Sequence, residues 1–156
     1  MANVTILGGS QGSGSNTDAV DTTKVHPLGT KATGGGKEYV YAEGSASIAQ
    51  YGVVIFDAAW VADQAVAGDV GMVGVAQAAI VASSYGWFQI WGISEVLADA
   101  AVAANVQLYL TATVSDVDDA VVAGDNILGM TSIAAGDNTT VAVMLTYPHV
   151  TNAALD

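Results

Sequence analysis

Few residues in this sequence have the type and spacing that catalysis requires. Gly8-Gly9-Ser10-Gln11-Gly12 matches, letter by letter, the G-x-S-x-G pattern around a serine nucleophile. That pattern works where a strand turns sharply into a helix and a histidine lies nearby, whereas the Ser- and Gly-rich residues that follow here predict no helix. His26 and His149 each stand beside a proline, with no carboxylate or nucleophile next to them. We therefore predict no catalytic residues and no enzyme.

Binding patterns for phosphate and metal ions are also incomplete. Residues 31–38 resemble a phosphate-binding loop only at a Gly-Lys pair, and they lack its first glycine and its magnesium-binding Ser or Thr. Residues 116–119 form an acidic turn, but the glycine and the final glutamate of a calcium loop are missing from the sequence that follows. The chain has no cysteine, which excludes disulfides and thiolate sites. We expect no metal ion and no cofactor, with weak calcium binding at the acidic turn as the alternative.

The strongest signal is an uncharged stretch, residues 70–94. Its length would suffice for a membrane span. However, its apolar residues are mainly Ala, Gly and Val, and glycines interrupt it, so we predict no membrane segment. Because aromatic and β-branched residues follow a Ser-Ser-Tyr-Gly turn, we expect a β-hairpin with strands near 72–82 and 87–93 and a turn at 83–86.

Alternation along the second strand of this hairpin gives it two apolar faces. Trp87, Gln89 and Trp91 share one face, and Phe88 and Ile90 share the other. A second sheet can cover one face, so the other must be covered by a loop or by another molecule. We predict that Trp87, Gln89 and Trp91, with the neighbouring Tyr85, form a contact with another subunit or protein. A sugar-stacking platform and ordinary core packing are the alternatives.

The elements that must position these residues fall into two parts. Residues 1–37 are rich in Gly, Ser and Thr, so we expect a flexible or extended docking arm. Residues 38–156 contain many short strands separated by Gly-Asp turns, which predicts a single all-β domain. The expected fold is a compact β-sandwich or barrel, jelly-roll-like or β-tulip-like. The candidate contact residues of the arm are Val4, Ile6, Leu7, Lys24, Lys31 and Lys37.

Charge is distributed unevenly along the chain. The formal net charge is -12, and thirteen of the fifteen acidic residues follow Lys37, where no Lys or Arg occurs. Nucleic-acid binding by this part of the chain is excluded because phosphate contacts require basic side chains. Charged residues make up only 12% of the sequence, less than usually coats a solitary domain. The composition favours a protein that packs against neighbours.

A series of short motifs runs along residues 26–149. The motifs, in order, are Pro27-Leu28-Gly29-Thr30, Lys37-Glu38-Tyr39-Val40-Tyr41, Gly74-Val75-Ala76, Gly86-Trp87, Val106-Gln107-Leu108-Tyr109 and Tyr147-Pro148. Together they resemble the head decoration, or cement, proteins of tailed bacteriophages.

The resemblance implies a β domain on the outer capsid surface of the virion, often a homotrimer or another homo-oligomer, that stabilises the expanded head. It also implies an N-terminal arm that reaches the major capsid protein or a neighbouring copy. The alternatives are a receptor- or glycan-binding knob of a phage fibre, and another shell-forming structural subunit.

Overall fold

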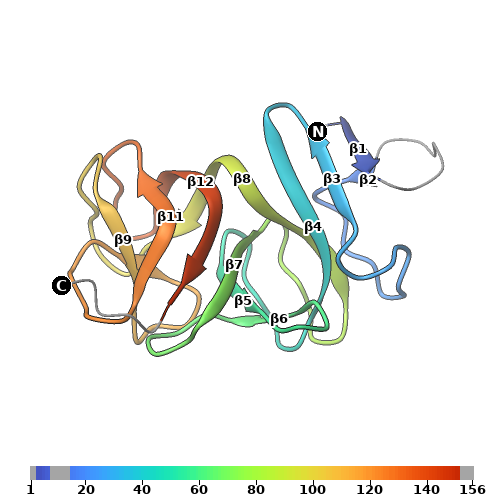
Figure 1. Ribbon diagram of the computed structural model, residues 1–156, viewed down its shortest axis with the longest axis horizontal. Coiled ribbons are helices and arrows are strands. Elements are labelled where there is room, and N and C mark those ends of the chain that lie inside the picture. The colour runs from blue at the N-terminus through green and yellow to red at the C-terminus, as the bar shows by residue number, and fades with distance from the viewer. Residues whose placement is uncertain (1–2, 8–14, 152–156) are drawn as a thin grey trace.

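The computed structural model describes residues 3–7 and 15–151 (Figure 1). These residues form twelve β-strands and no helix, which confirms the predicted all-β class. The strands are β1 (Asn3–Leu7), β2 (Ser15–Asn16), β3 (Lys31–Gly34), β4 (Lys37–Gly44), β5 (Val53–Phe56), β6 (Val61–Gln64), β7 (Gly71–Ala76), β8 (Tyr85–Leu97), β9 (Gln107–Leu110), β10 (Val117–Asp118), β11 (Asn126–Ser132) and β12 (Thr140–Val150).

Five of these strands close a small barrel. β8 pairs with β4 and β7, β7 pairs with β5, and β6 joins β5 to β4. Only the β4–β6 pair is parallel. Alternate side chains of each strand point inward and fill the interior, as expected for a barrel of this size. They form one buried cluster, which includes Val40, Ala42, Val54, Phe56, Ala62, Ala76, Phe88 and Ile90.

A second layer packs beside the barrel. The C-terminal half of β8 pairs with β12, and β11, β9 and β10 follow in order (Figure 1). A bridge between Ala98 and Val117 brings the chain after β8 against β10. Large side chains from these strands fill a second core, among them Leu108, Leu110, Ile127, Met130 and Leu145. The barrel and the second layer therefore each have their own core.

β5 and β7 form a shared wall between the two cores. Alternate residues of each strand face opposite ways, and both faces are covered. Val53, Ile55, Val73 and Val75 face the second core, and Val54, Phe56, Met72 and Ala76 face the barrel. Burial on both faces explains why the first half of the uncharged stretch contains no polar alternation.

The predicted hairpin is correct in its pairing and wrong in its bounds. β7 and β8 are antiparallel neighbours, but β7 ends at Ala76, so residues 77–84 form the connection. Ile80 falls within the predicted first strand but is not part of β7. Its side chain is buried in the barrel core, and its backbone pairs with Ile48 instead of β8. β8 continues past the predicted end at 93 because its last residues pair with β12.

The predicted arm boundary also needs correction. β3 pairs with the first half of β4 through a turn at Gly35-Gly36, and β1 pairs with β3. A boundary at residue 37 therefore falls at the end of a hairpin turn. β1, β2 and β3, which lie within residues 1–37, belong to the folded sheet because backbone pairing and the buried side chain of Ala32 offset their ordering entropy. A docking role for this segment stays a prediction.

Candidate functional site

Trp87 is buried by the N-terminal segment of its own chain. Its ring centroid lies 5.2 Å from that of Tyr41 and 5.4 Å from that of His26. His26 also meets Tyr41 edge-on, at 5.0 Å. We call this group the aromatic layer; it also contains Leu28, Ala32, Tyr39 and Tyr85. Because only 2% of Trp87 is exposed, the prediction that it contacts another molecule is wrong. The covering loop that the sequence left as an alternative is residues 17–32.

Asp21 fastens this covering segment to the barrel. The Tyr41 hydroxyl donates a hydrogen bond of 2.7 Å to Asp21 Oδ2. Asp21 and Tyr85 exchange two backbone hydrogen bonds of 2.8 Å each. Tyr85, predicted as an interface residue, is thus half-buried beneath its own chain. Burial, and then the hydrogen bond to the Asp21 carboxylate, raise the pKa of the Tyr41 hydroxyl well above its usual value of 10.0.

Tyr41→Phe tests this link through its pH dependence. The variant should be less stable than the native chain by about 1–2 kcal/mol at neutral pH, because it loses a hydrogen bond to a carboxylate. The folded state holds the Tyr41 proton more tightly than the unfolded state does. The stabilisation is therefore complete below about pH 10 and is lost as the pH rises further. Urea unfolding should show the gap between the two proteins narrowing above pH 10. Tyr109→Phe, on β9, is the control, and a gap that stays constant would contradict the link.

Gln89 is fully buried and shapes the strand around it. Its Nε2 donates to the carbonyl oxygens of Trp91, at 2.9 Å, and Ile93, at 3.0 Å. These two bonds span Gly92, where φ is +90°. Trp91, just before it, pairs with β4 on one side and β12 on the other. Gln89 therefore holds the point where β8 passes from the barrel to the second layer, and its predicted interface role is wrong.

An apolar face is exposed where β8 meets β12. Trp91 is 38% exposed and Ile93 is 51% exposed. Ile93 pairs directly with Met144, and the Trp91 and Tyr147 rings lie 5.1 Å apart. We call Trp91, Ile93, Met144 and Tyr147 the exposed apolar face. Trp91 is the one predicted interface residue that lies on it. The other three were missed, although alternation in residues 91–97 would have indicated Ile93.

One basic residue, Lys31, borders this face. Lys31 Nζ lies 5.7 Å from the centroid of the Tyr147 ring, and the Tyr147 hydroxyl donates a 2.7 Å hydrogen bond to Glu38. Lys37 is half-buried, whereas Lys24 is exposed in the segment before β3. The remaining predicted arm residues, Val4, Ile6 and Leu7, lie on β1, whose backbone pairs with Ser15 of β2 and with β3. Of the predicted arm contacts, Lys31 is thus placed beside the exposed apolar face.

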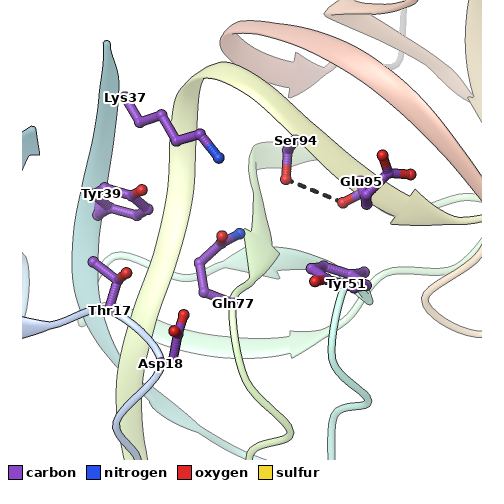
Figure 2. Close-up of a pocket in the computed structure, with 8 residues that line it drawn as sticks. All are labelled: Thr17, Asp18, Lys37, Tyr39, Tyr51, Gln77, Ser94 and Glu95. Carbon is purple, nitrogen blue, oxygen red and sulfur yellow. Dashed lines mark hydrogen bonds between the residues drawn. The ribbon is translucent and has the colours of Figure 1, made fainter. Parts of the chain in front are cut away.

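A polar pocket of about 240 Å³ lies between β4, β8 and the N-terminal segment (Figure 2). Four of its polar side chains are more than nine-tenths buried: Thr17, Tyr39, Gln77 and Ser94. Burial raises the pKa of the Tyr39 hydroxyl, and a hydrogen bond with Thr17 opposes this rise. Asp18, Lys37, Tyr51 and Glu95 complete the lining. Sequence patterns did not indicate this pocket because its residues are spread over positions 17 to 95.

The acidic turn that suggested calcium has a structural role. The Asp119 carboxylate accepts a hydrogen bond from the backbone N–H of Ala103, at 2.8 Å. Burial and the nearby Asp99 raise the pKa of Asp116. Across residues 3–7 and 15–151 no group of three or more acidic or histidine side chains is arranged to hold a metal ion, and no helix is long and apolar enough to cross a membrane.

The Gly8–Gly12 motif, which resembles the pattern around a serine nucleophile, lies outside the described residues.

The fold defines an all-β barrel with a second layer of strands, and this architecture occurs in a known phage protein. No family model matches the sequence, and no curated protein matches it. Among solved structures, the chain is similar to the head fibre gp8.5 N base of bacteriophage phi29, with a TM-score of 0.53. The two share 9% sequence identity, so the likeness shows a common fold. The match covers 76% of this chain and 97% of the phi29 chain.

Proposed function

We propose that this chain is a structural protein of a tailed-phage head, and that it decorates the outer capsid surface as a cement protein. The observation that carries the proposal is the fold shared with the N-terminal base of the phi29 head fibre. Almost the whole of that base is matched, so the shared part is a complete unit and not a common fragment. The resemblance of residues 26–149 to decoration proteins points to the same part of the virion.

The exposed apolar face is the proposed contact with the major capsid protein or with a neighbouring copy. Trp91 and Tyr147 are the large, amphipathic residues that dominate protein interfaces, and Ile93 and Met144 extend their surface across the two strands. A net charge of -12 suits an outer surface, away from packaged DNA. A symmetric head repeats such a contact, which fits the proposed homotrimer or other homo-oligomer.

The second candidate is the base of a head fibre, with a receptor- or glycan-binding function further along that fibre. The phi29 protein supports it, because the matched domain is named as a fibre base. Both candidates require attachment to heads. They differ in that a cement protein strengthens the shell, whereas a fibre base needs only to be anchored there.

Co-sedimentation with undecorated, expanded heads tests the proposal. We expect the full-length chain to pellet with heads and to raise the temperature at which the heads release DNA. Pelleting without that rise would favour the fibre base. Failure to pellet would refute both candidates. A chain that starts at Lys37 would lack the residues that cover Trp87 and would expose this side chain. The test therefore uses point variants.

Ile93→Glu should weaken head binding by about 30-fold or more, because it places a charge in the centre of the apolar face. Val121→Glu is the matched control: it makes the same chemical change at a residue that is 79% exposed in a loop. Equal loss of binding in both variants would point to charge repulsion alone. Full binding by Ile93→Glu would show that the contact lies elsewhere.

A further inference from the structure

The polar pocket is a built site in which buried hydrogen-bonding groups converge. Five separate segments contribute to it: residues 17–18, the start of β4, the residues before β5, the residues after β7, and the bend of β8. Gln77 lies near the centre in Figure 2, with Tyr39 and Thr17 on one side and Ser94 on the other. Polar side chains from separate segments that converge around an open pocket offer a polar ligand several hydrogen-bonding groups at once.

Local bonds fix these side chains in place. Gln77 Nε2 donates to the Val75 carbonyl, at 3.1 Å, and Ser94 Oγ donates to the Glu95 carbonyl, at 3.0 Å. With these donors engaged, the side-chain oxygens of both residues retain capacity to accept hydrogen bonds. Lys37 extends its ammonium group toward the centre of the pocket and supplies donors (Figure 2). The pocket therefore offers acceptors and donors together.

The charges of the lining indicate a neutral ligand. Asp18 and Glu95 contribute two negative charges, and Lys37 contributes one positive charge. Two carboxylates disfavour an anion, and the structure shows no cluster suited to a metal cation within its described residues. Hydroxyl groups, which both donate and accept hydrogen bonds, match the mixed lining best. A ligand rich in hydroxyl groups is thus favoured.

Tyr51 adds an aromatic wall. Its φ of +65° turns the backbone so that the ring lies beside the pocket (Figure 2). Two backbone bonds hold this residue: its N–H donates to Ala76, at 2.8 Å, and its carbonyl accepts from Leu97, at 3.0 Å. A fixed, half-exposed phenol ring offers an apolar face and a polar tip. A sugar ring presents the complementary combination of C–H face and hydroxyl edge.

We propose that this pocket binds one neutral saccharide ring, with Tyr51 against the ring face and Lys37, Gln77 and Glu95 on its hydroxyl groups. The volume of about 240 Å³ is below the roughly 300–1,000 Å³ of pockets for drug-sized ligands, which limits the ligand to a single small ring. The pocket shares no residue with the exposed apolar face, so the inference goes beyond head attachment.

NMR titration of the isotope-labelled full chain with glucose, galactose, rhamnose and N-acetylglucosamine tests the proposal. At least one sugar should shift the amide signals of residues 17–18, 37–39, 51 and 94–95 together. Tyr51→Ala and Lys37→Gln should each weaken that binding at least tenfold. Their matched controls, Tyr109→Ala and Lys24→Gln, should leave it unchanged, and unshifted signals elsewhere show that the variants remain folded.

The proposal is overturned if none of the four sugars shifts these signals, or if binding survives both pocket variants. The methyl glycoside of the sugar that binds separates two sources of the ligand. The methyl group blocks the anomeric hydroxyl, as a glycosidic bond in a glycan does. If the methyl glycoside binds as well as the sugar itself, the pocket accepts the end of a surface glycan. If the methyl glycoside does not bind, the pocket takes a free sugar. Tyr51→Ala should still pellet with heads. Failure of the sugar proposal is therefore distinguishable from failure of the head proposal.

Discussion

Replacing Trp87 with alanine is expected to lower the free energy of unfolding by about 3–5 kcal/mol. The side chain is 2% exposed and is surrounded by Tyr41, Tyr85 and His26. Its removal leaves a cavity that the two paired strands beneath cannot close. Urea unfolding measures the loss. Trp91→Ala is the control, because it makes the same change on the same strand at a residue that is 38% exposed, and it should cost about 1 kcal/mol.

Trypsin gives a second measure of the same variant. The only Lys and Arg residues of the chain are Lys24, Lys31 and Lys37, so every tryptic site lies in the N-terminal segment or at the start of β4. Loss of Trp87 should release this segment from the barrel and speed cleavage at Lys31 and Lys37. If Trp87→Ala unfolds no more easily than Trp91→Ala and is cleaved no faster, the covering role of residues 17–32 is wrong.

Gly92→Ala is expected to destabilise the chain by at least about 2 kcal/mol. Two effects add: φ is +90°, which disfavours any side chain, and an added Cβ would lie 2.4 Å from the Gly36 carbonyl oxygen. That oxygen belongs to the backbone of the β3–β4 turn and cannot move without disturbing the hairpin.

Gly35→Ala separates these two effects. Gly35 also has a positive φ, +61°, but an added Cβ would meet no atom within 4 Å. The Gly35→Ala substitution should lower the free energy of unfolding by about 1 kcal/mol, and this loss reflects backbone strain alone. Thermal unfolding of the two variants provides the comparison. Equal losses would mean that the close approach of Gly36 to β8 contributes nothing.

The general architecture could be predicted from local patterns. Aromatic and β-branched residues in 87–93 indicated a strand, and Gly-Asp pairs indicated turns, because both signals depend on near neighbours. The inference that both faces of this strand are covered was also correct for residues 86–90 of β8, and wrong for residues 91–95. What covers them depends on contacts distant in sequence. His26 and Leu28 sit more than fifty positions before Trp87, in a segment whose composition predicted an arm.

The candidate site was less predictable for the same reason. Gln89 looked like a polar group at an interface, but it bonds to two carbonyls of its own strand across a bend that the sequence marks only by Gly92. The polar pocket joins Thr17 to Glu95 through pairings that no spacing rule reveals. Of the four predicted interface residues, Trp91 alone lies on the exposed apolar face. Its pair with Glu38 is the last between β8 and β4, and beyond it β8 pairs with β12.

The shared wall of β5 and β7 gives the chain a single unit of cooperativity. Neither core has a complete boundary without these two strands, so the loss of one core removes a side of the other. Unfolding of this part of the chain should therefore be all-or-none, with β7 amides exchanging their hydrogens only when both cores open. A force applied at the second layer would be carried through β7 into the barrel, so both halves of the molecule would resist it together.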